Sequence, residues 1–389
     1  MSISSFRRQV IRAINALFPK NRHKAMFASS PDFSDNARAL YNYMVSQPDF
    51  DDWQFVWLVK PDFVAQQHRN TLFISAHGWK NYLRYLYHLF TSKYLFCTHS
   101  HFVEANPSRQ ISACLWHGTM LKRICAMNER EKSQPRKDQY RFFVSPSKFN
   151  NEFFCKSFLC SPEQVLTCGY PRNDFLFQET NILTDLGIDR DDYSKIIVYM
   201  PTFRTPIRGG YSDSDSNTIS CLQLEDEEQI KKVSEFFVTH KVLLLIKWHQ
   251  SDKRQFIKVC HPNIISIDNR QLNLKDLQIY HLLHYADALI TDYSSVFCDY
   301  MMLNRPIAFD IADIDSYANN RGFVFKEPLE YMPGYILRTC DDLLSFTEDV
   351  VNGKDKSAEK RRNLYGVYND FKDEHSSERL LKGLMKYKD

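Results

Sequence analysis

Short apolar runs alternate with amphipathic stretches along most of this chain. The runs have the length of buried strands, and many are rich in β-branched or aromatic side chains. In the first half we predict strands at 25–28, 55–59, 71–75, 94–97, 112–115, 142–145 and 165–168. In the second half we predict strands at 196–199, 242–247, 264–267, 288–291 and 306–309.

Stretches of helical periodicity lie between these runs. We predict helices at 36–45, 80–90, 147–158, 226–238, 276–284 and 294–303. Strands that alternate with helices indicate parallel sheets covered on both faces. The polar stretch 178–194 has few bulky apolar residues and predicts a linker, so we expect two α/β domains with a central cleft at the carboxyl ends of their strands.

The first residues form a separate pattern. Residues 4–19 place five apolar side chains on one helical stripe, with a basic flank, which is typical of a helix lying on anionic lipid. The stripe consists of Phe6, Val10, Ile14, Leu17 and Phe18, and the flank of Arg7, Arg8 and Arg12. The alternative is a helix that packs on the body of the protein.

Composition and charge restrict the class of protein. Of 389 residues, 43% are hydrophobic and 25% charged, as in soluble globular proteins, and a net charge of +3 is too small to favour nucleic acid as a partner. The ten cysteines form no CxxC pair, which suits a reducing compartment. No apolar run has the length of a membrane span, and no signal peptide is evident, so we expect a cytoplasmic protein or one held on the inner membrane face.

Two candidate sites follow predicted strands of the first half. In Trp116-His117-Gly118-Thr119, a histidine at a strand's end is suited to act as a general base, with Gly118 allowing close approach of a ligand. The alternative is a structural histidine whose ring forms its hydrogen bonds with nearby backbone groups. In Gly169–Asp174, Arg172 could meet a phosphate and Asn173 or Asp174 could cap the next helix, although a purely structural turn fits equally well.

The second half carries cations and hydroxyl groups at the same kind of position. Arg204 follows the strand at 196–199, and Lys247 and His249 follow the apolar run at 242–246, although surface ion pairs are a common fate of such residues. The strongest signal is Thr291-Asp292-Tyr293-Ser294-Ser295 at a strand–helix junction, where free N–H groups and hydroxyls form an anion site. Capping alone is the alternative.

Asp-x-Asp sequences occur at 213–215 and 313–315, the latter close to Arg321. We expect neither to bind a metal ion, because the cations and the helix end already supply charge for a diphosphate. No cofactor is expected.

Taken together, these motifs resemble the CDP-glycerol glycerophosphotransferase family of teichoic-acid and capsule synthesis. The matching segments are SDNARALYNYM (34–44), WHGTMLKRI (116–124), SKFNNEFF…GYPRND (147–174), YMPTFR (199–204), KWH (247–249), ITDYSSVFCDYMMLNRP (290–306) and the run 313–323. The resemblance spans roughly 24–335. It implies two Rossmann-like domains in a glycosyltransferase-B-like arrangement, peripheral membrane behaviour and attack on a CDP-polyol.

The resemblance also implies roles for residues. His117 would be the base, and His249 the second catalytic residue, in contact with the diphosphate. The phosphate-binding set would be Arg204, Lys247, Thr291, Ser294 and Ser295. Further substrate contacts would come from Gly118, Thr119, Arg172, Asn173, Asp174, Asp292 and Arg321. The chain departs from the family pattern at Met120, Cys125 and Gln250, which leaves the exact donor and acceptor open.

We therefore expect a basic amphipathic helix at 1–23, an acceptor domain at 24–185 and a nucleotide-donor domain with C-terminal helices at 186–389. The expected reaction is transfer of glycerol 3-phosphate from CDP-glycerol to a hydroxyl of a lipid-linked or polymer acceptor at the cytosolic membrane face. Two alternatives stay open: the same fold acting on CDP-ribitol or a nucleotide sugar, and a non-catalytic nucleotide-binding assembly protein.

Overall fold

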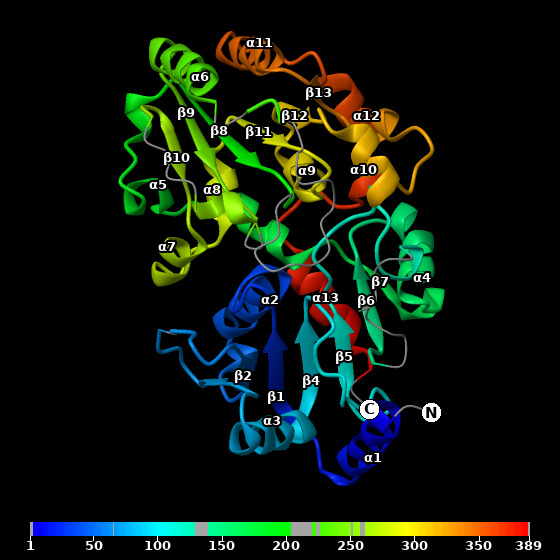
Figure 1. The fold of residues 1–389 in the computed structure, drawn as a ribbon. Coiled ribbons are helices and arrows are strands. Elements are labelled where there is room, and N and C mark those ends of the chain that lie inside the picture. Colours follow the sequence, from blue (N-terminus) through cyan, green and yellow to red (C-terminus); the bar gives the residue numbers. More distant parts are fainter. Residues whose placement is uncertain are drawn as a thin grey trace. The chain divides into compact units, whose positions relative to one another are not determined.

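A computed structural model describes residues 3–64, 66–128, 139–203, 220–222, 226–249, 252–256 and 261–387. The chain forms two compact units (Figure 1). The first comprises 1–117, 124–175 and 370–389, and the second comprises 118–123 and 176–369. The sequence placed the domain boundary near 185, whereas the second unit begins at 176. Two further segments also differ from the expectation: 118–123 belongs to the second unit and 370–389 to the first.

The first unit is built on a seven-stranded parallel sheet. Its strands are β1 Asn21–Ala28, β2 Gln54–Leu58, β3 Thr71–Ile74, β4 Ser92–Cys97, β5 Ile111–Cys114, β6 Phe142–Ser145 and β7 Val165–Thr167. The order is β3-β2-β1-β4-β5-β6-β7, so the strand order reverses between β1 and β4. Most of the strands contain a continuous buried run, as in Ala25–Ala28 of β1, which explains why their sequences are apolar over several residues rather than alternating.

Helices cover this sheet and return to it from the end of the chain. They are α1 Ile3–Leu17, α2 Asp35–Ser46, α3 Trp79–Thr91, α4 Asn151–Phe158 and α13 Ser376–Met385. The last of these packs against α2, more than 300 residues earlier in the chain. Asp174 holds its first turn, because the carboxylate accepts the backbone N–H groups of Ser376 and Ser377, both at 2.9 Å. This contact and the packing on α2 hold 370–389 in the first unit.

The second unit repeats the architecture with six parallel strands. They are β8 Lys195–Met200, β9 Val242–Ile246, β10 Ile264–Ser266, β11 Ala288–Thr291, β12 Ile307–Asp310 and β13 Tyr335–Leu337, in the order β10-β9-β8-β11-β12-β13. One face packs on α6 Glu227–Thr239 and α11 Cys340–Val351 around a core that includes Val233, Leu244 and Phe346. The order reverses between β8 and β11, as in Rossmann sheets.

The remaining helices of the second unit are α5 Ile182–Asp185, α7 Asn269–Leu274, α8 Ile279–Tyr285, α9 Val296–Tyr300, α10 Ile314–Asn320 and α12 Ala358–Tyr368. Two expectations differ from the structure. The stretch predicted as a linker contains α5, whose Ile182 and Leu183 are buried. The helix expected at 294–303 is the short α9 followed by a 3₁₀ turn at Met301–Leu303.

Candidate active site

His117 lies just beyond β5, at the carboxyl edge of the first sheet. The preceding residue, Trp116, has a left-handed backbone (φ 54°), which is uncommon for a bulky residue and turns the chain sharply. The Nδ1 atom of His117 lies 3.0 Å from the carbonyl oxygen of Thr98, which follows β4. Because a carbonyl oxygen only accepts, Nδ1 carries the proton and Nε2 of the neutral ring is left as a proton acceptor.

The backbone around His117 is held by α2 and by the turn after β7. Asn36 donates its side-chain N–H to the carbonyl of Trp116 at 2.9 Å. Arg172 donates to the carbonyl of His117 at 2.9 Å and to the carboxylate of Asp35 at 2.9 Å. The guanidinium of Arg172 is therefore engaged in a buried ion pair that positions His117.

A second histidine lies against the first. The rings of His99 and His117 are stacked, with centroids 3.9 Å apart and an interplanar angle of 9°. The Nδ1 atom of His99 lies 2.9 Å from the hydroxyl of Thr98. Sequence reasoning missed His99, although a histidine directly after a buried strand is the same signal that singled out His117.

Two other residues of the first motif belong to the second unit. Gly118 approaches Ser295 so closely that a Cβ on the glycine would lie 2.7 Å from the serine Oγ. The segment continues as a β-bridge between Lys122 and Phe323. Thr119 is buried, and its hydroxyl makes no hydrogen bond within the described part of the chain.

The turn after β7 has a structural role at each remaining position. Asn173 is buried, and its N–H donates to the carbonyl of Tyr170 at 2.9 Å. Asp174 caps α13, as described above, rather than the next helix along the chain. Burial raises the pKa of Asp174 to about 6, against the opposing effect of the hydrogen bonds from Ser376 and Ser377.

At the second sheet, Asp292 organises the edge where the strand order reverses. Its Oδ2 accepts the N–H of Thr202 at 2.8 Å and the hydroxyl of Thr202 at 2.7 Å. Its Oδ1 accepts the N–H of Ser294 at 3.0 Å. This fully buried carboxylate ties the end of β8 to the end of β11.

The hydroxyl side chains after β11 differ in what they contact. Thr291 is buried, and its hydroxyl donates to the carbonyl of Met200 at 2.7 Å. Ser294 and Ser295 are half-buried. Ser295 precedes α9 without making a side-chain cap, so the simple capping alternative does not describe it.

The end of β9 brings cations to the same edge. Lys247 is buried, its ammonium donates to the carbonyl of Trp248 at 2.9 Å, and burial lowers its pKa to about 8. His249 is exposed, with its ring 5.0 Å from that of Phe203. Arg254, which sequence reasoning missed, stacks on Trp248 at 4.6 Å and donates to the carbonyl of Thr202 at 3.2 Å.

Arg204 and the aspartates at 213–215 lie outside the described residues. Arg321 is half-buried at the C-terminal end of α10, where its N–H donates to the carbonyl of Tyr317 at 2.9 Å. Among the described residues, no group of three histidine, cysteine or acidic side chains is arranged to hold a metal ion.

Two Rossmann-like parallel sheets, each with polar side chains at its switch-point edge, define an α/β protein of the glycosyltransferase-B-like class. Residues 10–386 match the family described as CDP-Glycerol:Poly(glycerophosphate) glycerophosphotransferase. The chain belongs to this family, as its motifs had indicated.

Relatives of nearly equal length act in teichoic-acid synthesis. A teichoic acid poly(glycerol phosphate) polymerase of Bacillus spizizenii is 28% identical, with 93% of this chain and 91% of the relative covered. A teichoic acid glycerol-phosphate transferase of Staphylococcus aureus is 26% identical, with 91% and 90% covered. A teichoic acid ribitol-phosphate primase of Bacillus spizizenii is 24% identical, with 95% and 92% covered.

Solved structures confirm the fold class. A variant of the wall teichoic acid polymerase TagF matches with a TM-score of 0.76 at 21% identity, covering 100% of this chain and 99% of that one. A putative UDP-N-acetylglucosamine 2-epimerase of Listeria monocytogenes matches with a TM-score of 0.52 at 14% identity, covering 94% and 97%.

Proposed function

We propose that this protein transfers glycerol 3-phosphate from CDP-glycerol to a hydroxyl group of a teichoic-acid or capsule polymer precursor and releases CMP. Family membership supports the reaction class. The observation that carries the chemistry is the hydrogen bond from Nδ1 of His117 to the Thr98 carbonyl, which leaves Nε2 to accept a proton.

In the proposed step, Nε2 of His117 takes the proton of the acceptor hydroxyl. The acceptor oxygen attacks the phosphorus that bears the glycerol, and the bond from that phosphorus to the oxygen bridging it to CMP breaks. CMP departs with the electron pair of that bond as a phosphate whose second pKa is about 6. This leaving group needs neutralising charge more than a proton, whereas the alcohol needs a base.

The second unit supplies the donor site in this proposal. Ser294 and Ser295 offer hydroxyls to the diphosphate, and Lys247, His249 and Arg204 offer positive charge. Asp292, Arg172 and Asp174 are not proposed as substrate contacts, because Asp292 accepts from Thr202, Arg172 donates to the His117 carbonyl and Asp174 accepts from Ser376. Thr291 supports the edge of the sheet through Met200.

A second donor is favoured by one specific observation. Relatives over nearly the whole chain include a teichoic acid ribitol-phosphate primase, so CDP-ribitol is the rival substrate. The residues described here would handle a diphosphate of either donor. A non-catalytic assembly protein is the third reading, and the fixed tautomer of His117 argues against it.

We also infer that the protein works on the inner face of the cell membrane, where a lipid-linked acceptor would be found. No described helix is long and apolar enough to cross a bilayer, so attachment would be peripheral. The small net charge of +3 does not favour nucleic acid as a partner.

The test is product analysis with purified protein and a panel of CDP-glycerol, CDP-ribitol and UDP-sugars. We expect CMP release from CDP-glycerol in equal amount to phosphate-linked glycerol on the acceptor. Faster turnover of CDP-ribitol than of CDP-glycerol would identify CDP-ribitol as the donor. Absence of CMP release from every CDP-alditol would overturn the proposal.

A further inference from the structure

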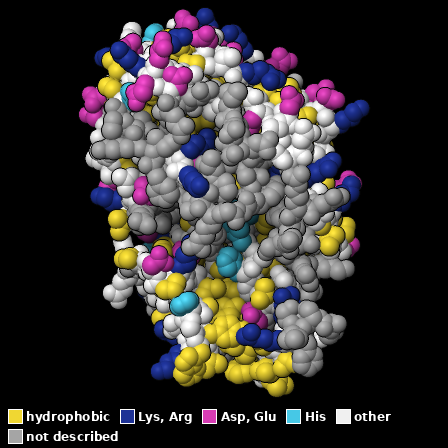
Figure 2. All heavy atoms as spheres, in the orientation of Figure 1, with side chains coloured by type: hydrophobic (Ala, Val, Ile, Leu, Met, Phe, Trp, Pro, Cys, Tyr) yellow, Lys and Arg dark blue, Asp and Glu magenta, His cyan; other side chains and the backbone are white. Residues whose placement is uncertain are grey.

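The loop that follows β4 contributes two of the groups that hold His117. The carbonyl of Thr98 lies 3.0 Å from Nδ1 of the His117 ring, and the ring of His99 stacks on it at 3.9 Å. Histidine side chains reach the surface near the carboxyl end of β4 in Figure 2. Because Thr98 and His99 are consecutive residues, a change in the path of this loop would move both groups together.

The backbone of this loop turns tightly. The N–H of His101 donates to the carbonyl of His99 at 2.8 Å, which closes a three-residue turn around Ser100. The next residue, Phe102, has a left-handed backbone (φ 57°) although it is a buried aromatic residue. Such a conformation costs free energy and persists only where the surrounding structure holds it. The loop therefore needs support from other parts of the chain.

Tyr140 provides support from just before β6. Its hydroxyl lies 3.1 Å from the carbonyl of His99 and also donates to the carbonyl of His101. Burial raises the pKa of Tyr140 well above its usual value, so the hydroxyl keeps its proton at neutral pH and acts as a donor. One hydroxyl thus contacts both ends of the three-residue turn.

The carbonyl of His99 has three such neighbours, and they differ in origin. The N–H of His101 and the Sγ atom of Cys97, which lies 3.0 Å away, belong to the same strand and loop. Tyr140 comes 41 residues after His99 in the chain. Of these three groups, the hydroxyl of Tyr140 is therefore the one that ties the turn to a different part of the sheet.

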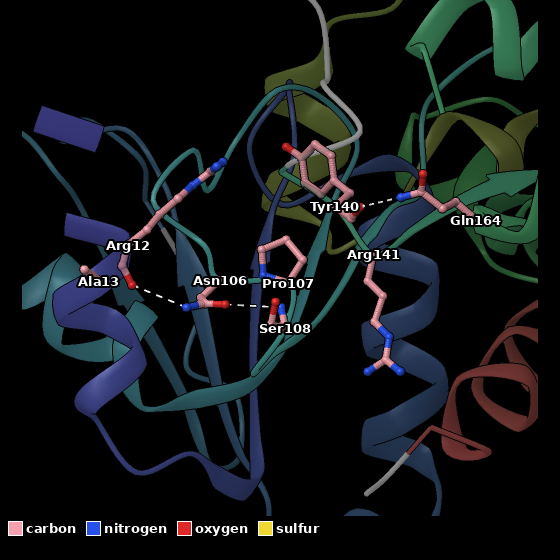
Figure 3. A pocket seen from close by; sticks show the side chains of 8 residues that line it. All are labelled: Arg12, Ala13, Asn106, Pro107, Ser108, Tyr140, Arg141 and Gln164. Carbon is pink, nitrogen blue, oxygen red and sulfur yellow. Dashed lines mark hydrogen bonds between the residues drawn. The ribbon is translucent and has the colours of Figure 1, made fainter. Parts of the chain in front are cut away.

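Tyr140 is itself fixed by the sheet. The side-chain N–H of Gln164 donates to the carbonyl of Tyr140 at 3.1 Å (Figure 3). The ring of Tyr140 lies edge-on to that of Phe143 in β6, with centroids 5.8 Å apart. Gln164 also accepts the N–H of Ser161 at 3.2 Å, in the 3₁₀ turn before β7. The position of the hydroxyl is therefore set by β6 and by the turn before β7.

We propose that Tyr140 is a positioning residue for the base: its hydroxyl holds the turn at 99–101 and so keeps the Thr98 carbonyl and the His99 ring against His117. This inference rests on the proposed function, in which His117 takes the proton of the acceptor. Tyr140 acts through the loop, because a side chain of a residue only 1% exposed meets neither donor nor acceptor.

The physical consequence concerns the tautomer of His117. A loosened turn withdraws the carbonyl that accepts from Nδ1, so both neutral tautomers of the ring become populated. The tautomer with its proton on Nε2 has no free nitrogen facing the acceptor hydroxyl. Fewer molecules then hold the base in its active form.

The test is Tyr140→Phe, which removes one oxygen atom and keeps the ring. We expect kcat for CMP release to fall about tenfold, as for the loss of one buried hydrogen bond, with KM for CDP-glycerol unchanged. The second readout is the nuclear magnetic resonance spectrum of isotope-labelled histidine rings, assigned with His117→Ala. Neutral His117 should carry its proton on Nδ1 in the wild type and should show averaged signals of two tautomers in Tyr140→Phe.

The matched control is Tyr368→Phe in the second unit. Tyr368 is also buried, and its hydroxyl donates to the carbonyl of Tyr331 at 2.7 Å, so the control removes the same kind of hydrogen bond. It should leave kcat and the His117 spectrum unchanged. Near-ultraviolet circular dichroism checks the folding of each variant.

A second variant keeps the test decisive if Tyr140→Phe does not fold. Gln164→Met removes the hydrogen bond to the Tyr140 carbonyl and leaves the hydroxyl in place. Because it acts one step further from the loop, it should lower kcat by a smaller factor, about threefold, and shift the His117 spectrum in the same direction.

Two results would overturn the inference. Wild-type kcat and an unchanged His117 spectrum in Tyr140→Phe would mean that Tyr140 only packs. A lowered kcat with an unchanged spectrum would mean that the hydroxyl acts by a route other than His117. A changed spectrum with wild-type kcat would instead support the positioning of His117 and contradict its proposed role as the base, so the two failures are distinguished.

Discussion

The two sheets have similar topology, but the residues at their carboxyl edges differ in chemistry. In the first unit, Arg172, Asp35 and Asn36 fix the backbone at one histidine, and a carbonyl sets the tautomer of its ring. In the second unit, a buried carboxylate, Asp292, ties two strand ends together. The first edge is built to orient a single proton acceptor, whereas the second presents hydroxyls and cations.

This difference suggests a division of labour. A base must be held in one orientation, because proton transfer depends on hydrogen-bond geometry. A diphosphate carries its charge over several oxygens, so several donors can share its binding. We therefore expect substitutions at the first edge to change turnover and substitutions at the second edge to change donor affinity.

The largest expected effect is that of His117→Ala. Loss of a general base should lower kcat by ~10²–10⁴-fold. The dissociation constant of CDP-glycerol, measured by calorimetry, should change little, because the proposed contact of His117 is with the acceptor. A near-normal kcat in this variant would mean that another residue is the base. A large loss of donor affinity would contradict the proposal that the first sheet's edge serves the acceptor and the second the donor.

The pH dependence of donor binding should report Lys247. Burial lowers the pKa of this lysine to about 8, so its positive charge is present below pH 8 and is lost as the pH rises through that value. Affinity for the diphosphate should therefore weaken by up to about tenfold per pH unit above 8. In Lys247→Met this dependence should disappear, whereas its persistence would assign the titration to another group.

A smaller effect is expected at His99. Its ring stacks on His117 at 3.9 Å, and such aromatic pairs contribute ~0.5–1.5 kcal/mol, so His99→Ala should lower kcat by up to about tenfold with KM for the donor unchanged. His99→Phe keeps a flat ring and should restore most of kcat. If His99→Phe does not restore kcat, the role of His99 is in proton transfer rather than in positioning.

An effect on donor binding alone is expected of Ser294→Ala combined with Ser295→Ala. Each lost hydrogen bond costs ~0.5–1.5 kcal/mol, so KM for the donor should rise by roughly tenfold with kcat largely kept. The matched control is Ser234→Ala in α6. The hydroxyl of Ser234 donates to the Pro262 carbonyl at 2.8 Å, so the control also removes a serine hydrogen bond. An unchanged KM in the double variant would mean that the pair does not contact the donor.

Most strands were predictable because buried parallel strands contain continuous apolar runs that differ clearly from the polar turns around them. The strand β13 was missed, since Tyr335–Leu337 is short and only partly buried. The C-terminal helices α11 and α12 were not predicted as separate elements. The return of α13 to the first unit depends on Asp174, some 200 residues earlier, and no local pattern encodes such a contact.

At the site, sequence alone located the strand ends but not what their side chains contact. For Arg172 the sequence left a phosphate contact and a purely structural turn equally open. Its guanidinium bonds to Asp35 and to the His117 carbonyl, partners that only the folded chain brings together. Thr291 was predicted as a phosphate ligand, and its hydroxyl bonds to a neighbouring strand. The sequence predicted where a residue lies along a strand, but not which residue it bonds to on a neighbouring strand or loop.

The most direct measurement is the location of bound CMP, by crystallography or by hydrogen exchange of the full chain. We expect the nucleotide at the carboxyl ends of β8, β9 and β11, with protection or density at 201–203, 247–249 and 292–296. Residues around His117 should stay unchanged with CMP alone. CMP bound only at the edge of the first sheet, beside His99 and His117, would contradict the division of labour between the two units.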